Sequence, residues 1–103
     1  MDILELSVKD VAVKMNAESV FIDVREPGEY EEVHAKGVKN VPLATVSVET
    51  IGEENKDKTV YLICRSGKRS MTAAKKLQEE GFNDLVNVEG GTLAWVAAGL
   101  DTV

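Results

Sequence analysis

Residues 59–80, "TVYLICRSGKRSMTAAKKLQEE", decide the fold class, because a buried strand, a turn and a helix follow one another there. The run 59–64 is apolar or β-branched at nearly every position, which predicts a strand buried on both faces. From Ser70 the sequence has apolar residues at helical spacing. Gly81 then stands where a helix typically ends. The stretch therefore predicts a strand–loop–helix unit.

Similar patterns lie on both sides of this unit. Further strands are predicted in "ILEL" (3–6), "SVFIDVR" (19–25) and "LVNVE" (85–89). The stretch "GVKNVPL" (37–43) predicts a short strand or an extended turn, broken by Pro42. Helices are predicted in "VKDVAVKM" (8–15) after the N-cap Ser7, in "PGEYEEV" (27–33), and in "GGTLAWVAAGL" (90–100). The stretch "TVSVETIGEENKD" (45–57) predicts a short helix and an acidic loop.

Strands that alternate with helices and are apolar throughout predict an α/β fold with a mainly parallel sheet. Without a repeat or a linker, residues 1–103 are expected to form one domain. Ligands of such sheets bind beyond the carboxyl ends of the strands. Cys64 ends the clearest strand, and Asp23 and Arg25 end another. We therefore expect these three side chains at one edge of the sheet.

Charge and cysteine content exclude several classes of function. The formal net charge of −6 argues against nucleic acid or an anionic membrane as the main partner. Cys64 is the only cysteine, so it forms neither an internal disulfide nor a zinc site alone, and no metal is expected. The opening "MDILELSVKD" resembles no signal peptide, and no long apolar run follows. A cytoplasmic location is therefore predicted.

The loop after Cys64 carries the most specific chemistry in the sequence. A free cysteine at the end of a strand is often only part of the core. Here the residues after it are Arg65, Ser66, Gly67, Lys68, Arg69 and Ser70. A tight arc at the start of a helix would turn backbone N–H groups toward the sulfur, and Gly67 permits such an arc. With the cations, these donors predict a lowered pKa of Cys64, opposed only weakly by burial because the sulfur is expected to be open to substrate.

Three ordered motifs resemble the rhodanese family of single-domain sulfurtransferases. "CRSGKRS" after "VYLI" looks like the family's active-site loop, and "FIDVREPGEYEEVHAKGVKNVPL" resembles the first half of its signature. "VNVEGGTLAWVAAGL" is similar to its closing Gly-Gly…Trp segment. The resemblance implies a rhodanese-like α/β fold of about five mainly parallel strands with helices on both faces. It also implies Cys64 as a persulfide carrier, with no metal and no organic cofactor.

The expected function is transfer of a sulfane sulfur from a small anionic donor such as thiosulfate to cyanide or to a small-molecule or protein thiol. Arg65 and Lys68 are expected to bind the anionic donor. The alternative is a sulfur-carrier or regulatory persulfide module with little turnover of its own. Phosphatases and arsenate reductases place five residues between cysteine and arginine, whereas four separate Cys64 from Arg69, which disfavours both.

Other residues have either a functional or a structural interpretation. Asp23 and Arg25 either orient the loop or the substrate, or form a buried salt bridge. His34 is either a general base or, as we favour, a structural hydrogen-bonding group. Trp95, with Leu93 and Val96, is interpreted as core packing of the last helix.

Overall fold

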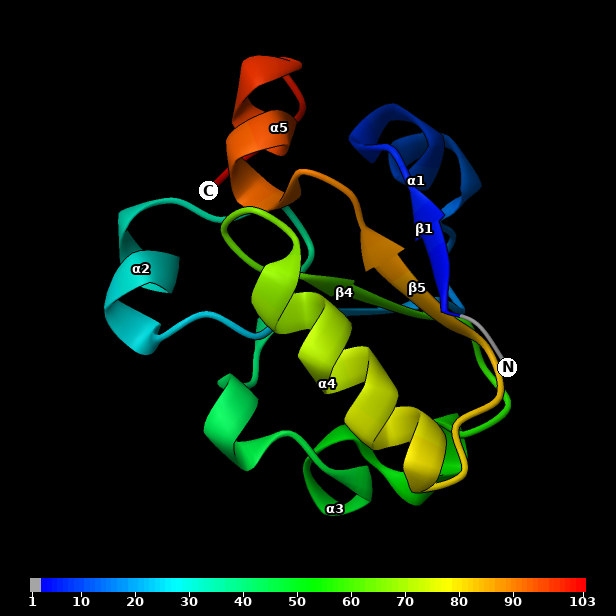
Figure 1. Ribbon diagram of the computed structural model, residues 1–103. Coiled ribbons are helices and arrows are strands. Elements are labelled where there is room, and N and C mark those ends of the chain that lie inside the picture. Colours follow the sequence, from blue (N-terminus) through cyan, green and yellow to red (C-terminus); the bar gives the residue numbers. More distant parts are fainter. Residues whose placement is uncertain (1–2) are drawn as a thin grey trace.

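Five strands form one parallel sheet in the computed structural model, which describes residues 3–103 (Figure 1). Their order across the sheet is β1-β5-β4-β2-β3, and every pair of neighbours is parallel. The strands are β1 (Leu4–Leu6), β2 (Val20–Asp23), β3 (Lys39–Asn40), β4 (Val60–Ile63) and β5 (Leu85–Val88). The predicted α/β class and parallel sheet are confirmed.

Helices cover both faces of this sheet, as predicted (Figure 1). One face packs against α4 and the short helices near it, and the other packs against α1 and α5. The helices are α1 (Val8–Lys14), α2 (Pro27–Glu32), α3 (Val48–Ile51), α4 (Lys68–Glu79) and α5 (Gly91–Ala97), with 3₁₀ turns η1 (Leu43–Thr45) and η2 (Glu53–Asn55).

Strand β4 lies in the middle of the sheet and contributes to both halves of the core. Val60 and Leu62 belong to the cluster that α4 covers, whereas Tyr61 and Ile63 belong to the cluster under α1 and α5. Successive side chains of a strand point to opposite faces, so a strand buried on both faces has to be apolar throughout. This burial explains the uninterrupted apolar run in the sequence.

Local signals set the helix ends as the sequence predicted. The Ser7 side chain accepts a hydrogen bond from the Asp10 N–H at 3.2 Å and begins α1. At the end of α4, Phe82 N–H donates to the Leu77 carbonyl and Gly81 N–H to the Gln78 carbonyl, each at 3.1 Å. This pair of bonds is a Schellman motif, which Gly81 permits because its φ is +99°.

Two predictions about helices are wrong in detail. Helix α4 begins at Lys68 and not at Ser70, because Gly67 adopts a left-handed conformation (φ +107°) and acts as the N-cap. Lys68 and Arg69 therefore lie in the first turn of α4. Leu93 and Val96 are not core residues, because α5 buries Trp95 on its inner side and leaves these two side chains 53% and 49% exposed.

Candidate functional site

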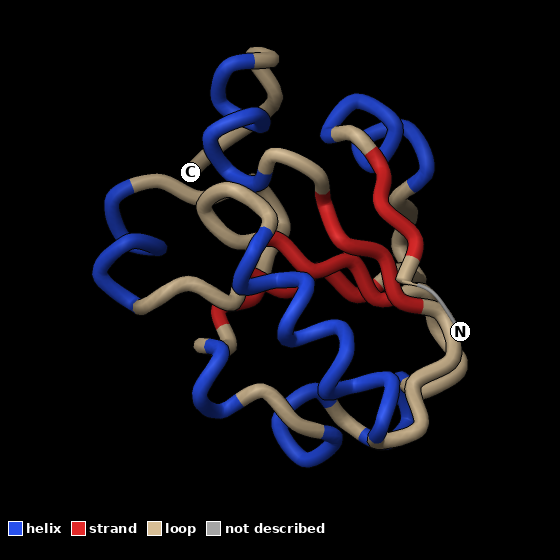
Figure 2. The backbone as a smooth tube through the Cα atoms, in the orientation of Figure 1, coloured by secondary structure: helices blue, strands red, loops and turns tan. Residues whose placement is uncertain are grey.

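The carboxyl ends of β2, β4 and β5 meet at one edge of the sheet, and Cys64 lies at the centre of this edge. β4 pairs with β2 on one side and with β5 on the other. Cys64 follows the last residue of β4, and a short loop leads from it to Gly67 at the start of α4. Figure 2 shows this loop as one arc beside the amino end of α5. The edge is where a parallel sheet is expected to hold its ligand.

Two donors point at the sulfur of Cys64. The Gly67 N–H donates to Sγ at 3.0 Å, and the Ser70 hydroxyl lies 3.3 Å from the same atom. One donor comes from the loop and the other from the first turn of α4, so the arc and the helix start act together. Cys64 is only 1% exposed, which corrects the expectation that its sulfur is open.

The pKa of the Cys64 thiol is lowered, as the sequence predicted, and the predicted backbone N–H donors are among the causes. Burial is the largest single contribution and raises the pKa, because it disfavours the charged thiolate. It is outweighed by hydrogen bonds from the Ser70 hydroxyl and from the backbone N–H groups of Ser70, Gly67 and Ser66. The thiolate is therefore stabilised mainly by these hydrogen bonds and not by the charges of the neighbouring cations.

Helix α5 supports the loop from behind. The Thr92 N–H and hydroxyl both donate to the Cys64 carbonyl, at 2.8 and 3.1 Å, and the Leu93 N–H donates to the Arg65 carbonyl at 3.2 Å. Gly91 lies so close that a Cβ atom there would approach the Arg65 carbonyl oxygen to 2.6 Å. The Gly-Gly turn therefore lets α5 dock its unpaired N–H groups on the loop.

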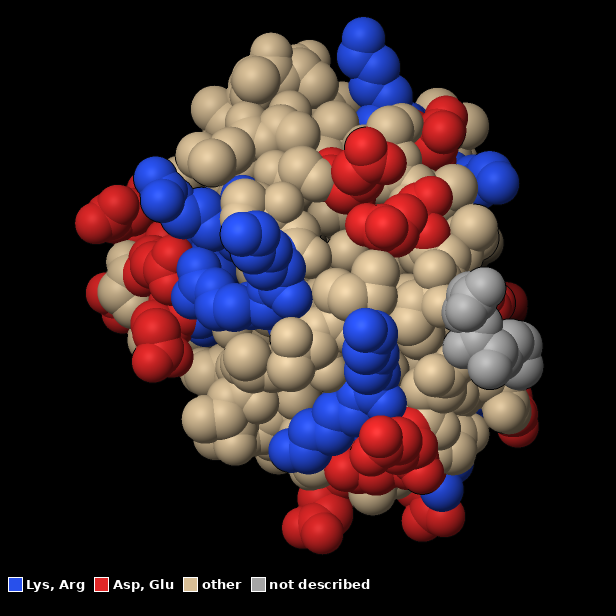
Figure 3. Space-filling view, viewed as in Figure 1, with Lys and Arg blue, Asp and Glu red and all other residues tan. Residues whose placement is uncertain are grey.

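The three cations near Cys64 have different surroundings. Arg69 forms a bidentate ion pair with Glu29 of α2, at 2.8 and 2.9 Å. Arg65 and Lys68 are exposed, and no carboxylate of residues 3–103 forms an ion pair with either. Figure 3 shows basic side chains gathered over the start of α4, beside the acidic side chains of α2. Only Arg65 and Lys68 are therefore free to attract an anion.

Asp23 and Arg25 form the buried salt bridge that was one of their two interpretations. The Arg25 Nη2–H donates to Asp23 Oδ2 at 2.8 Å and to the Val33 carbonyl at 2.6 Å. Asn40 donates from Nδ2 to the carbonyls of Asp23 and Arg25, at 3.0 and 2.9 Å. These bonds tie the end of β2 to the segment after α2.

His34 has a structural partner. Its Nδ1 lies 2.7 Å from the Tyr30 carbonyl, and its ring stacks on the Tyr30 ring with centroids 3.7 Å apart. Both contacts join the segment after α2 to Tyr30 of α2 itself, and neither involves the loop. This agrees with the structural interpretation that the sequence favoured.

Asn87 is a residue at this site that the sequence did not single out. The residue is 1% exposed, and its side chain contacts both Gly67 and Ser70, each of which donates to the sulfur. The signal was present as one amide side chain within the apolar strand "LVNV". A buried amide requires several hydrogen-bond partners, so an amide at that position indicates a built polar site.

A groove of about 460 Å³ opens between α2 and α5, beside the loop. Its lining includes Arg65, Val33 and three residues of α5 that lie on one side of the helix: Leu93, Val96 and Ala97. This volume is in the range of small-molecule sites. The exposure of Leu93 and Val96 therefore gives this edge of the sheet an apolar border next to Arg65.

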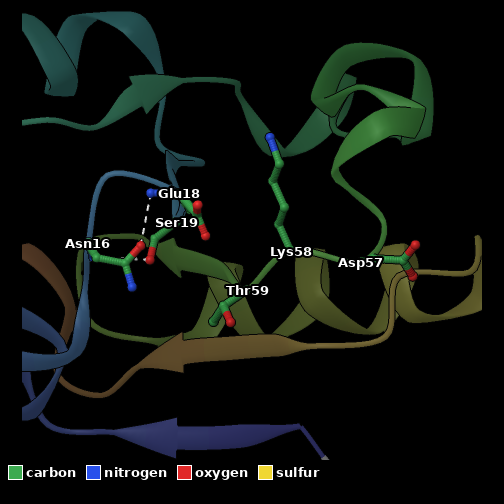
Figure 4. A pocket seen from close by; sticks show the side chains of 6 residues that line it. All are labelled: Asn16, Glu18, Ser19, Asp57, Lys58 and Thr59. Atoms are coloured by element: carbon green, nitrogen blue, oxygen red, sulfur yellow. Dashed lines mark hydrogen bonds between the residues drawn. The ribbon is translucent and has the colours of Figure 1, made fainter.

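A second hollow, of about 210 Å³, is lined by the side chains in Figure 4. It lies at the amino ends of β2 and β4, the opposite edge of the sheet. Its polar groups are partly engaged in a turn, in which Asn16 Oδ1 accepts from the Glu18 N–H. Within residues 3–103 we find neither a membrane-spanning helix nor a group of three or more His, Cys, Asp or Glu side chains placed to hold a metal ion.

The fold and sequence of this chain match those of known proteins. The family model described as "Rhodanese-like domain" matches residues 7–98. A rhodanese-related protein from Thermoplasma volcanium has a TM-score of 0.84 and 30% identity, with 97% of both chains covered. A thiosulfate sulfurtransferase from Pseudomonas aeruginosa shares the fold, with a TM-score of 0.83 over 98% of this chain and 20% of its own, at 24% identity.

Two of the curated relatives from Bacillus subtilis have names that refer to sulfur chemistry. The Bacillus subtilis protein named "Putative sulfurtransferase YtwF" is 40% identical, with 92% of both chains covered. The one named "Putative sulfur carrier protein YrkF", also from Bacillus subtilis, is 36% identical over 88% of this chain and 50% of its own length. The chain thus spans only half of YrkF, and even less of some other relatives. The match over residues 7–98 and the nearly full-length likeness to YtwF show that the chain belongs to the rhodanese-like domain family.

Proposed function

We propose that the protein is a sulfurtransferase that carries a sulfane sulfur as a persulfide on Cys64. One observation carries this proposal: the sulfur of a single cysteine receives a loop N–H at 3.0 Å and a hydroxyl at 3.3 Å at the carboxyl end of the central strand. Such donors stabilise a thiolate before attack and an anionic sulfur when it leaves. The remaining loop residues Arg65, Ser66, Lys68 and Arg69 are assigned to substrate binding or loop support.

The reaction has two halves. In the first, the Cys64 thiolate attacks the outer sulfur of thiosulfate, a new S–S bond of about 2.05 Å forms, and sulfite leaves with the electron pair of the broken bond. In the second, a nucleophile such as cyanide or a thiolate attacks the outer sulfur of the persulfide. The S–S bond breaks, and its electron pair returns to Cys64 as thiolate. Charge and atoms balance in each half without an added oxidant or metal.

Two features support a sulfur anion over a phosphoryl group as the ligand of the loop. Four residues separate Cys64 from Arg69, so the arc is short. Arg69 also donates from both Nη1 and Nη2 to the carboxylate of Glu29, which orients its guanidinium toward α2 and offsets its charge. Both features disfavour a phosphatase or an arsenate reductase.

A second candidate is a sulfur-carrier module that exchanges sulfur with other proteins and has little turnover of its own. Cys64 is almost completely buried, whereas a groove with an apolar border formed by α5 lies open next to its loop. This combination suits an acceptor that brings its own contact surface to the site. The likeness to a relative named as a sulfur carrier also favours it.

Intact-mass spectrometry tests both candidates. The protein is incubated with thiosulfate, the mass gain of one sulfur is measured, and cyanide is then added to assay thiocyanate. Loading followed by turnover supports the enzyme, and loading only from a persulfidated protein supports the carrier. Cys64→Ser is the control and should acquire no sulfur, while its melting temperature stays close to that of the parent. A wild-type protein that takes sulfur from neither source would refute the persulfide proposal.

A further inference from the structure

The side chain of Asn87 contacts two residues that donate to the sulfur, Gly67 and Ser70. Its Nδ2 group donates to the Gly67 carbonyl at 3.0 Å and to Glu5 Oε2 at 3.1 Å. Its Oδ1 atom is in very short contact with the Ser70 hydroxyl, which in turn lies 3.3 Å from Cys64 Sγ. A continuous chain of contacts therefore runs from the sulfur through Ser70 and Asn87 to Glu5 of β1.

The amide of Asn87 has only one favourable orientation. Gly67 O and the Glu5 carboxylate accept hydrogen bonds and cannot donate, so the NH₂ end of the amide has to face them. Both Nδ2 protons are used in this way. The oxygen of the amide is consequently fixed against Ser70, and it is satisfied only when Ser70 donates to it.

The Ser70 hydroxyl has one proton and two acceptors within reach. When Cys64 is a thiol, its S–H can donate to Ser70 and the Ser70 proton can go to Asn87, so each group has a partner. When Cys64 is a thiolate, the sulfur needs the Ser70 proton, and Asn87 Oδ1 is left facing an oxygen without a donor. Asn87 and the thiolate thus compete for the same proton.

We infer that Asn87 is a positioning residue for Cys64. Asn87 holds the Gly67 carbonyl and controls the direction in which the Ser70 hydroxyl donates. The hydroxyl turns to the sulfur when the sulfur is anionic and to Asn87 when the sulfur carries the transferred atom. The inference deepens the proposed persulfide function. Its test reads only the ionisation of Cys64, so a failure of the inference and a failure of sulfur transfer are separate outcomes.

A double-mutant cycle between Asn87 and Ser70 isolates this competition. The alkylation rate of Cys64 with iodoacetamide is measured against pH in the wild type, Asn87→Leu, Ser70→Ala and the double variant. Leucine has the branched outline of asparagine but can neither hold Gly67 nor compete for the hydroxyl proton. Asn87→Leu removes the hydrogen bond to the Gly67 carbonyl whether residue 70 is serine or alanine, so this loss affects the titration of Cys64 in both cases. The competition for the hydroxyl proton exists only when Ser70 is present.

The expected result is non-additive. Asn87→Leu shifts the titration midpoint of Cys64 both when Ser70 is present and when Ser70 is replaced by alanine. We expect the midpoint to move further down, or less far up, when Ser70 is present. The two shifts should differ by about half to one pH unit, the effect of one hydrogen bond. Equal shifts of the midpoint in the two backgrounds, or a difference of the opposite sign, would overturn the inference. Should Asn87→Leu not fold, Asn87→Ala enters the same cycle with the same criterion.

Charged groups near the sulfur require a control. They are Arg65 of the loop, Lys68 and Arg69 of α4, Glu29 of α2, Asp23 and Arg25 at the end of β2, and Glu5 of β1. Only Glu5 contacts Asn87, and Glu5→Gln removes its charge while an oxygen remains to accept from Nδ2. The coupling between Asn87 and Ser70 should persist in Glu5→Gln. Its disappearance there would assign the effect to charge and overturn the hydroxyl mechanism.

Discussion

Arg69 in the first turn of α4 donates to both carboxylate oxygens of Glu29 in α2, at 2.8 and 2.9 Å. The pair joins the helix that begins at the loop after Cys64 to the helix that follows β2. The hydrogen bond from Arg69 is the largest of the effects that hold the pKa of Glu29 at about 2, below its ordinary value of 4.5. Stability linked to this ion pair must therefore depend on pH.

The first prediction concerns Glu29→Gln. A depressed carboxyl pKa contributes stability that is present above about pH 4.5 and is lost as the pH falls toward 2. Both side chains are about one third exposed, so solvent screening reduces the contribution to about 1 kcal/mol. At pH 7 the variant should be less stable than the wild type by that amount, as measured by urea unfolding. A difference that stays constant between pH 7 and pH 2.5 would contradict the assignment.

The second prediction concerns Lys68, an exposed cation with no ion-pair partner among the described residues. Thiosulfate is a dianion and the chain has a net charge of −6, so its attraction has to come from local charge. Lys68→Met should raise the KM for thiosulfate about fivefold and leave the kcat nearly unchanged. Steady-state kinetics at low salt check this, and high salt should produce the same change in the wild type.

Lys75→Met is the matched control for Lys68, since Lys75 is an exposed lysine nearly two turns further along α4. It should leave the KM for thiosulfate unchanged. An equal rise in both variants would indicate a general effect of net charge and not a donor-binding role of Lys68.

The third prediction concerns the apolar border of the groove. Leu93 is 53% exposed, and its side chain lines the groove next to Arg65. Leu93→Ser should raise the KM about fivefold for a peptide acceptor with leucine beside its cysteine, because burial of such a side chain contributes about 1 kcal/mol. The KM for cyanide, which is too small to reach the groove while it attacks the sulfur, should not change. Val13→Ser, at an exposed apolar position of α1, serves as control and should change neither value.

The fourth prediction concerns Gly91, whose φ is +59° and whose missing Cβ leaves room for the Arg65 carbonyl. Gly91→Ala should lower the free energy of unfolding by about 2 kcal/mol or more, because the added methyl group meets backbone atoms that cannot move aside. It should also slow alkylation of Cys64, since the loop would be displaced. Gly28→Ala in α2 provides the contrast: outside the backbone of its own helix, no atom lies within 4 Å of the added Cβ, and helix propensity predicts a gain of up to about 1 kcal/mol.

Much of the fold could be predicted because it depends on local patterns. Three such patterns depend only on residues close in the sequence: the apolar run of β4, the N-cap Ser7 and the terminating Gly81. Each appears in the structure where it was expected. Cys64 could be identified in the same way, since a strand end, a glycine and a helix start coincide in seven residues. The alternation of strands and helices then predicted the edge of the sheet on which Cys64 lies.

What the sequence by itself determined was the order of the elements, the parallel sheet and the position of Cys64 at its carboxyl edge. Only the tertiary structure decided how the side chains around that cysteine are used. The partner of Arg69 is forty positions away in the chain, and Asn87 reaches Ser70 from seventeen positions away. Whether α5 buries or exposes Leu93 depends likewise on which of its sides docks on the sheet. Such contacts depend on the packing of distant segments, and no local pattern of residues encodes that packing.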